Sequence, residues 1–332
     1  MKLSEIGEFA FIDHFSPAFI KNLKKGVHGI GDDCAVLPLD EHKVTLITTD
    51  MLIEDSHFLR NRIPPVDLGY KSLAVNLSDI AGMGGMPRYA FLSLGIPGDI
   101  EVEWMDLFFS GLYDLCKETN VQLLGGDTTR SGKHLVINIG IIGEALKKHV
   151  KYRSTAKTGD VVCVTGELGD SGAGLRLILE NQVTGEKEKM LIDRHNRPRA
   201  HLQEGVWLGK HDHVHAMMDV SDGIDSDLER IMEKSSCGIR VDLKRLPCSG
   251  ALQDVCELKN WDMYEIAATG GEDYCLVCSV DPEIYPSINR AFREKFGREL
   301  FRIGEIIPGD KLVYFAGKEQ VTLTKHGFDH FA

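Results

Sequence analysis

The stretch Val44-Thr45-Leu46-Ile47-Thr48-Thr49-Asp50 is an apolar, β-branched run that ends at an aspartate. A run of this kind predicts a strand, so the carboxylate of Asp50 is expected at the edge of a sheet. Further along, residues 66–82 carry apolar side chains at helical spacing, and Gly82 can end that helix. This strand and helix are the first of several such units. The strands and helices alternate along the chain, which indicates the α/β or α+β class.

The same patterns continue on both sides of a polar, basic, turn-like segment at residues 145–160. Before it, they predict a helix at 101–119 and strands at 89–95, 121–124 and 134–143. After it, they predict helices near 172–182 and 224–235, and strands at 161–165, 239–242, 275–280 and 312–315. A chain of 332 residues has room for two domains, since one domain takes roughly 100–200 residues. We therefore expect two domains, at residues 1–148 and 149–332.

The composition excludes several classes of protein. The net charge of −12 disfavours binding to nucleic acid, whose phosphates would be repelled. No apolar run approaches the roughly 18 residues of a membrane helix, and the first residues lack a signal-peptide pattern, so we expect no membrane partner and a cytoplasmic location. An acidic protein that handles phosphates needs positive mediators, and metal ions are the obvious ones.

Aspartates recur where strands or helices run into small residues. The five segments are Gly29-Ile30-Gly31-Asp32-Asp33, Thr48-Thr49-Asp50, Asn76-Leu77-Ser78-Asp79, Gly125-Gly126-Asp127-Thr128-Thr129 and Met218-Asp219-Val220-Ser221-Asp222-Gly223. Each one alone is an ordinary turn or helix-cap pattern. Together they would supply many carboxylate ligands for Mg²⁺, which binds one or two carboxylates together with substrate phosphates.

Other motifs are missing or weak. The chain has no GxxxxGK[ST] loop and no HRD/DFG pair, so it is neither a P-loop enzyme nor a protein kinase. His211, His213 and His215 would share one face of a strand, which is compatible with a transition metal, but an exposed strand entry explains them as well. Cys275 and Cys278 point to opposite faces of a predicted strand, so we expect buried thiols rather than a zinc site.

Eight short motifs, in order along nearly the whole chain, resemble those of the thiamine-monophosphate kinase family. They are Gly29-Ile30-Gly31-Asp32-Asp33-Cys34-Ala35, Thr48-Thr49-Asp50, His57-Phe58, Ala74-Val75-Asn76-Leu77-Ser78-Asp79, Gly125-Gly126-Asp127-Thr128, Asp219-Val220-Ser221-Asp222-Gly223, Gly270-Gly271-Glu272-Asp273-Tyr274 and Gly327-Phe328-Asp329-His330-Phe331. The resemblance implies an N-terminal sheet domain that forms the core of a homodimer and a C-terminal α/β domain. ATP and Mg²⁺ are then expected between the two.

The resemblance also implies roles for individual residues. The expected Mg²⁺ ligands are Asp32, Thr48, Thr49, Asp50, Asp79, Asp127, Asp219 and Asp222, while Asp33 is either a ligand or shapes its loop. The expected ATP contacts are Tyr113, Gly126, Asp127, Arg153 and Ser221. The expected contacts to thiamine monophosphate are His57, Glu272 and Phe328, and a carboxylate with an aromatic face suits a thiazolium cation.

The implied reaction is direct in-line transfer of the γ-phosphoryl group of ATP to thiamine monophosphate, giving thiamine diphosphate and ADP. No residue is assigned as a general base, because a phosphomonoester with a second pKa near ~6 is already anionic at neutral pH. The related selenophosphate synthetase would carry a reactive Cys near the N-terminus, which residues 1–30 lack. The hydrogenase-maturation relative would have a Cys-bearing tail, and aminoimidazole ribonucleotide synthetase lacks the GFDHF ending. A non-catalytic sensor of thiamine phosphate or nucleotide is the alternative from another class.

Overall fold

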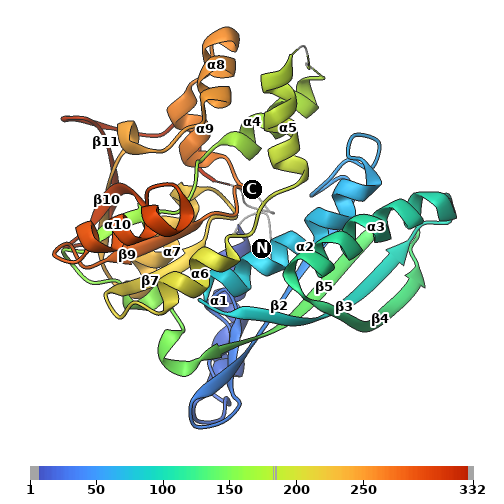
Figure 1. Cartoon of the computed structure of the whole chain (residues 1–332), viewed down its shortest axis with the longest axis horizontal. Coiled ribbons are helices and arrows are strands. Elements are labelled where there is room, and N and C mark those ends of the chain that lie inside the picture. The colour runs from blue at the N-terminus through green and yellow to red at the C-terminus, as the bar shows by residue number, and fades with distance from the viewer. Residues whose placement is uncertain (1–6, 182, 184, 328–332) are drawn as a thin grey trace.

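The computed structural model describes residues 7–181, 183 and 185–327, and it contains two sheets with helices between and around them (Figure 1). The first sheet has the order β1-β2-β5-β3-β4. Its strands are β1 (Ala35–Pro38), β2 (Lys43–Ile53), β3 (Met86–Ile96), β4 (Gln122–Arg130) and β5 (Val136–Leu146). Only the β3–β4 pair is parallel, because α3 (Val102–Thr119) makes the crossover between them.

The helices α2 (Pro65–Gly82) and α3 cover one face of this sheet. They approach each other closely because glycines stand at the contact: a Cβ on Gly69 would collide with the carbonyl of Phe108, and one on Gly111 with that of Val66. The other face of the sheet has no covering element among the described residues, and it exposes large apolar side chains.

The second sheet has the order β12-β11-β8-β10-β6-β9-β7. Its strands are β6 (Val161–Val164), β7 (Val214–Asp219), β8 (Gly238–Asp242), β9 (Leu276–Val280), β10 (Phe301–Ile307), β11 (Leu312–Ala316) and β12 (Glu319–Val321). The helices of this half are α4 (Asp170–Glu180), α5 (Glu186–Asn196), α6 (Leu202–Gly209), α7 (Ile224–Ser235), α8 (Gly250–Lys259), α9 (Met263–Thr269) and α10 (Tyr285–Phe296). The chain begins with α1 (Gly7–Ile20).

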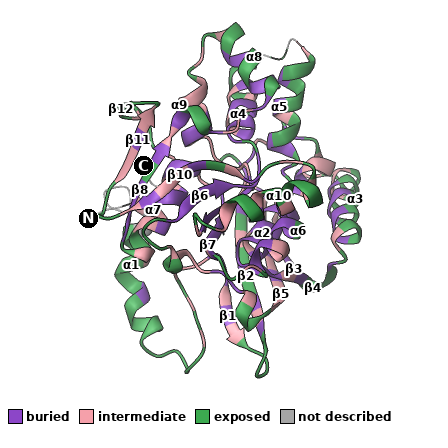
Figure 2. Ribbon diagram, turned by 60° about the vertical axis from the view of Figure 1, so that its left-hand side comes forward, coloured by how far each residue is buried: buried purple, intermediate pink, exposed green. Residues whose placement is uncertain are grey.

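A shared hydrophobic core joins the two halves. It contains Leu77 of α2, Ile139 of β5 and Leu276 of β9, so α2 is packed between the two sheets. A second core lies on the other face of the second sheet, under α7 and α9. The helices α4, α5 and α8 pack together as an outlying group with a small core of their own, as Figure 2 shows.

Most elements predicted from the sequence are present, and the α/β class is confirmed. Two strand ends were predicted too early. The strand at 44–49 was expected to end at Asp50, but β2 continues to Ile53 because its pairing with β5 extends past the aspartate. The strand at 121–124 was expected to end before Gly125, but β4 continues to Arg130 along the edge of the sheet. The buried-thiol interpretation of the CxxC is confirmed, since Cys275 and Cys278 are unpaired and lie in different hydrophobic cores. None of the described helices is long and apolar enough to cross a bilayer.

Candidate active site

A cavity of about 950 Å³ lies where the two halves of the chain meet. Its wall combines the end of β2 and α2 with the loops after β7 and α9, the helices α4 and α5, and the segment Lys325–Gly327. Eleven of the predicted site residues line it: Asp32, Thr48, Thr49, Asp50, His57, Asp79, Arg153, Asp219, Ser221, Asp222 and Glu272. Thr48 and Arg230, which are 182 positions apart in the sequence, share this cavity only because the two sheets pack against α2.

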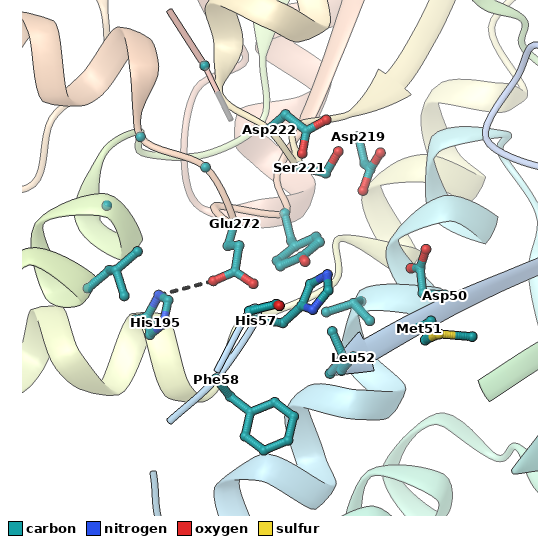
Figure 3. Close-up of a pocket in the computed structure, with 18 of the residues that line it drawn as sticks. Asp50, Met51, Leu52, His57, Phe58, His195, Asp219, Ser221, Asp222 and Glu272 are labelled. Atoms are coloured by element: carbon teal, nitrogen blue, oxygen red, sulfur yellow. Dashed lines mark ion pairs between the residues drawn. The ribbon is translucent and has the colours of Figure 1, made fainter. Parts of the chain in front are cut away.

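Carboxylates of like charge are concentrated at one end of this cavity. Asp50 lies on the inner face of β2, Asp79 lies on α2, and Asp219 ends β7 (Figure 3 labels Asp50 and Asp219). Burial, followed by the charge of Asp50, raises the pKa of Asp79 well above its usual value. Burial, followed by the charge of Asp33, raises the pKa of Asp219 to about 8. These groups therefore resist being ionised together unless a cation joins them.

The donor set fits a divalent cation that prefers oxygen. One carboxylate oxygen of Asp219 and one of Asp33 are buried without a hydrogen-bond partner in the described structure. No three acidic, His or Cys side chains of the described residues surround a common point at coordinating distance. Asp33 and Asp219 line the cavity, where a bound Mg²⁺ would keep water and substrate phosphate among its ligands.

The two threonines before Asp50 point in opposite directions. Thr48 is buried, and its hydroxyl donates to Asp79 Oδ2 at 2.5 Å. Thr49 is exposed, and its hydroxyl accepts from Asn138 Nδ2 at 2.9 Å on the open face of the sheet. Strand alternation therefore gives only Thr48 a side-chain contact with the acidic cluster.

Arg153 and Arg230 balance part of the negative charge. Arg153 donates to Asp33 Oδ1, with Nε at 2.9 Å, and its backbone N–H donates to Asp32 Oδ1 at 2.8 Å. Arg230 of α7 forms an ion pair with Asp222. Asp33, whose role the sequence left open, thus holds Arg153. Arg230 was missed because one arginine on an amphipathic helix carries no motif.

The opposite end of the cavity holds His57 and Glu272. His57 Nδ1 accepts the backbone N–H of Ile53 at 3.0 Å, which fixes the orientation of the ring. Glu272 Oε2 forms an ion pair with Lys71 of α2 at 2.8 Å, and it lies 3.1 Å from His195 Nδ1 of α5, a contact marked in Figure 3. Lys71 and His195 had no sequence signal, since each is a single polar residue within a helix. Phe328 lies outside the described residues.

Three predicted ATP contacts do not line the cavity of their own chain: Tyr113, Gly126 and Asp127. The sheet register explains this, because Asp50 pairs with Ile139, Ile139 with Leu92, and Leu92 with Gly126. Three strand steps correspond to about 14 Å. Tyr113 is exposed on α3, 67% of its surface being accessible.

The three histidines at 211–215 do not form a single group. Strand β7 begins only at Val214, and the ring of His211 turns back to pack on Trp207, with centroids 4.1 Å apart. His213 and His215 instead pair with Asp281 and Asp160, at 3.2 and 2.9 Å. These are exposed or half-buried ion pairs, in agreement with the plainer interpretation.

Comparison with known proteins identifies the family. The family models for AIR synthase related proteins match at residues 31–145 (N-terminal domain) and 157–316 (C-terminal domain). The chain is 40% identical to thiamine-monophosphate kinase of Escherichia coli K12, over 98% of both chains. It is 33% identical to that of Bacillus subtilis 168, over 98% of this chain and 99% of the relative.

Solved structures agree with this assignment. AaThiL complexed with AMPPCP and TMP superposes with a TM-score of 0.87 at 32% identity, covering 99% of both chains. The hydrogenase-maturation protein HypE in complex with ATP, at 18% identity and a TM-score of 0.70, shares the fold over 93% of this chain and 94% of its own. The chain therefore belongs to the thiamine-monophosphate kinase family of AIR synthase related proteins.

Proposed function

We propose that this chain phosphorylates thiamine monophosphate at the expense of ATP, giving thiamine diphosphate and ADP. The observation that carries the proposal is one cavity with buried, mutually repelling carboxylates at one end and the His57–Glu272 wall at the other. The first end suits metal-bound polyphosphate, and the second suits a cationic ring. AaThiL was solved with AMPPCP and TMP, and this chain matches it over nearly its full length.

The proposed transfer is in-line, from the γ-phosphorus of ATP to a phosphate oxygen of the acceptor. Bound Mg²⁺ would neutralise and align the two anionic groups. Asp50, Asp79 and Asp219 would hold the metal, and Asp32 and Asp222 lie on the same wall. Thr48 orients the carboxylate of Asp79 through its hydroxyl. His57 and Glu272 would hold the thiamine part, with Phe328 as a third proposed contact.

Stability should depend on pH in the metal-free protein. The folded-state pKa of Asp219 is about 8 and that of Asp32 about 6, both raised mainly by burial above the 3.8 of a free aspartate side chain. At pH values between the free pKa of 3.8 and these raised pKa values, the folded state binds more protons than the unfolded state. The free energy of unfolding therefore falls as the pH rises. We expect the melting temperature in EDTA to fall from pH 6 to pH 8.5. Mg²⁺, which binds the ionised groups, should raise it more at pH 8.5 than at pH 6; an equal rise at both would contradict the assignment.

We also propose a homodimer formed by the open face of the first sheet. That face exposes Ile47 and Met51 of β2 together with Tyr89 and Phe91 of β3, each at least 37% accessible. Exposed apolar side chains gathered on one sheet face are typical of a protein interface. Phe91→Asp is expected to give a monomer in light scattering, whereas the exposed Leu258→Asp on α8 should leave the dimer intact.

The dimer would account for Tyr113, Gly126 and Asp127, which we propose reach the nucleotide bound to the partner subunit. The test mixes two inactive variants, Asp50→Asn and Asp127→Asn, so that heterodimers form. If Asp127 serves the partner's site, each heterodimer contains one intact site and activity returns. If Asp127 serves its own chain, both sites carry a lesion and activity stays absent.

The domain limits stay a proposal: residues 1–148 as the ATP- and Mg²⁺-binding, dimer-forming domain, and residues 149–332 as the C-terminal α/β domain. The matched family models divide the chain between residues 145 and 157.

All eight cysteines are unpaired, which supports a reducing compartment such as the cytoplasm.

The function is tested by incubating the protein with ATP and Mg²⁺ and either thiamine monophosphate or free thiamine. Chromatography should find thiamine diphosphate and ADP from the monophosphate alone. Binding of thiamine monophosphate without formation of ADP would instead favour a sensor. No binding at all would contradict the assignment to this substrate.

A further inference from the structure

Lys71 is the largest side chain that is fully buried in the described structure, with 0% of it accessible. It comes from α2, in the first half of the chain, and its ammonium lies 2.8 Å from Glu272 Oε2, in the loop before β9. A buried ammonium is costly unless it is paired, so a lysine at this position requires an explanation. The reaction as derived above gives it no role.

The two carboxylate oxygens of Glu272 have different surroundings. Lys71 Nζ and His195 Nδ1 both contact Oε2, at 2.8 and 3.1 Å. No described residue forms a hydrogen bond with Oε1. In Figure 3 the ion pair with His195 leaves from one carboxylate oxygen, and the other oxygen is turned to the side of His57. One oxygen is therefore anchored in the wall and the other is presented to the cavity.

The backbone around Glu272 is fixed as well. Glu272 has a φ of 64°, a left-handed conformation that a non-glycine residue keeps only when its surroundings impose it. Its N–H donates to the carbonyl of Ser221 at 2.7 Å. The next residue, Asp273, accepts the N–H of Gly169 at 2.6 Å in front of α4.

The charges around Glu272 favour its ionised form. Burial alone would raise its pKa, but Lys71 and then His195 more than offset this, and the pKa lies below its usual value. His195 itself is neutral near pH 7, because burial, followed by the charge of Lys71, lowers its pKa to about 4. Among the charged groups around Glu272, Lys71 does most to lower its pKa, and His57 and Asp273 interact with it as well.

We propose that Lys71 is a positioning residue of the kinase site: it keeps Glu272 ionised and anchors Oε2, so that Oε1 is directed at the cationic ring of the substrate. This rests on the proposed function, since it assigns the recognition of the thiazolium to one oxygen of one carboxylate. Without Lys71, Glu272 would be a half-buried carboxyl group without its cationic partner, which favours uptake of a proton and loss of both its charge and its direction.

The test compares Lys71→Met with the wild type on two substrates: thiamine monophosphate, and an analogue in which an uncharged thiophene replaces the thiazolium. We expect the KM for thiamine monophosphate to rise about ten- to a hundredfold, the size of a lost charged hydrogen bond. The KM for ATP and for the neutral analogue should change less than about threefold. The loss should also grow as the pH falls from 8 to 6, because the carboxyl group of Glu272 then becomes protonated.

An equal rise in KM for the cationic and the neutral substrate would overturn the proposal, since a purely structural role affects both alike. If Lys71→Met does not fold, Lys71→Met/Glu272→Gln removes both charges and takes its place. This double variant should discriminate between the two substrates no worse than Glu272→Gln alone, and a further loss would contradict the proposal. Wild-type turnover of thiamine monophosphate, measured alongside, shows separately whether the proposed function holds.

Discussion

Asp50→Asn is expected to remove measurable turnover while the protein stays folded. Asp50 lies on the inner face of β2 near the buried Asp79, and its charge contributes to the raised pKa of that neighbour. The backbone N–H of Asp50 is held by Asn76 Oδ1 at 2.9 Å, a bond that does not involve the carboxylate. The asparagine can therefore occupy the same place. Without the carboxylate, the proposed Mg²⁺ site would lose one ligand. We expect kcat to fall on the order of a thousandfold.

The same variant should be at least as stable as the wild type without Mg²⁺, because one of several repelling charges is gone. Melting curves in EDTA and steady-state kinetics with ATP and thiamine monophosphate measure the two effects. Asp310→Asn, in the exposed turn between β10 and β11, is the matched control and should change neither. Turnover within a few fold of the wild type would refute the assignment of Asp50 to the metal.

The acidic cluster could be predicted because its signal is local. An aspartate that follows an apolar strand is expected at the end of that strand, and Asp219 is indeed the last residue of β7. Asp50 instead lies within β2, which continues to Ile53, and its side chain belongs to the inner face of that strand. The sequence around Asp50 and Asp219 does not predict how far apart the two carboxylates lie. That distance depends on the packing of α2 between the two sheets, which involves contacts between residues far apart in the chain.

Of the basic residues that pair with acidic side chains of the cavity, Lys71 and Arg230 were not predicted. Lys71, Arg153 and Arg230 are single basic residues, and their partners Glu272, Asp33 and Asp222 lie 201, 120 and 8 positions away. Only Arg153 was expected at the site, as an ATP contact implied by the family resemblance. The helices α1, α5, α6, α8, α9 and α10 were not predicted either, and several of them are short or carry mixed polar faces that give weak periodicity.

Arg153→Met is expected to cost more stability than any other single change discussed. The carboxylate of Asp33 is 0% accessible, and Arg153 is its ion-pair partner and hydrogen-bond donor. Removing one member of a buried pair leaves the other charge without compensation, at a cost of about 3–5 kcal/mol in the free energy of unfolding. Burial and the neighbouring Asp33 and Asp32 carboxylates act on the guanidinium, and its pKa stays above its usual value, so it is charged at every accessible pH.

The double variant Arg153→Met/Asp33→Asn separates charge from packing. It should recover most of the lost stability, because an uncharged amide replaces the stranded carboxylate. Urea denaturation of the wild type, both single variants and the double variant completes the cycle. Arg245→Met, which breaks the exposed pair with Asp242, is the control and should change stability by less than about 1 kcal/mol. If Arg153→Met proves as stable as this control, the charge of Asp33 must be balanced by something other than Arg153. An unpaired carboxylate beside the other aspartates would then cost little stability. The repulsion between these carboxylates could no longer be used as an argument for a metal-binding site.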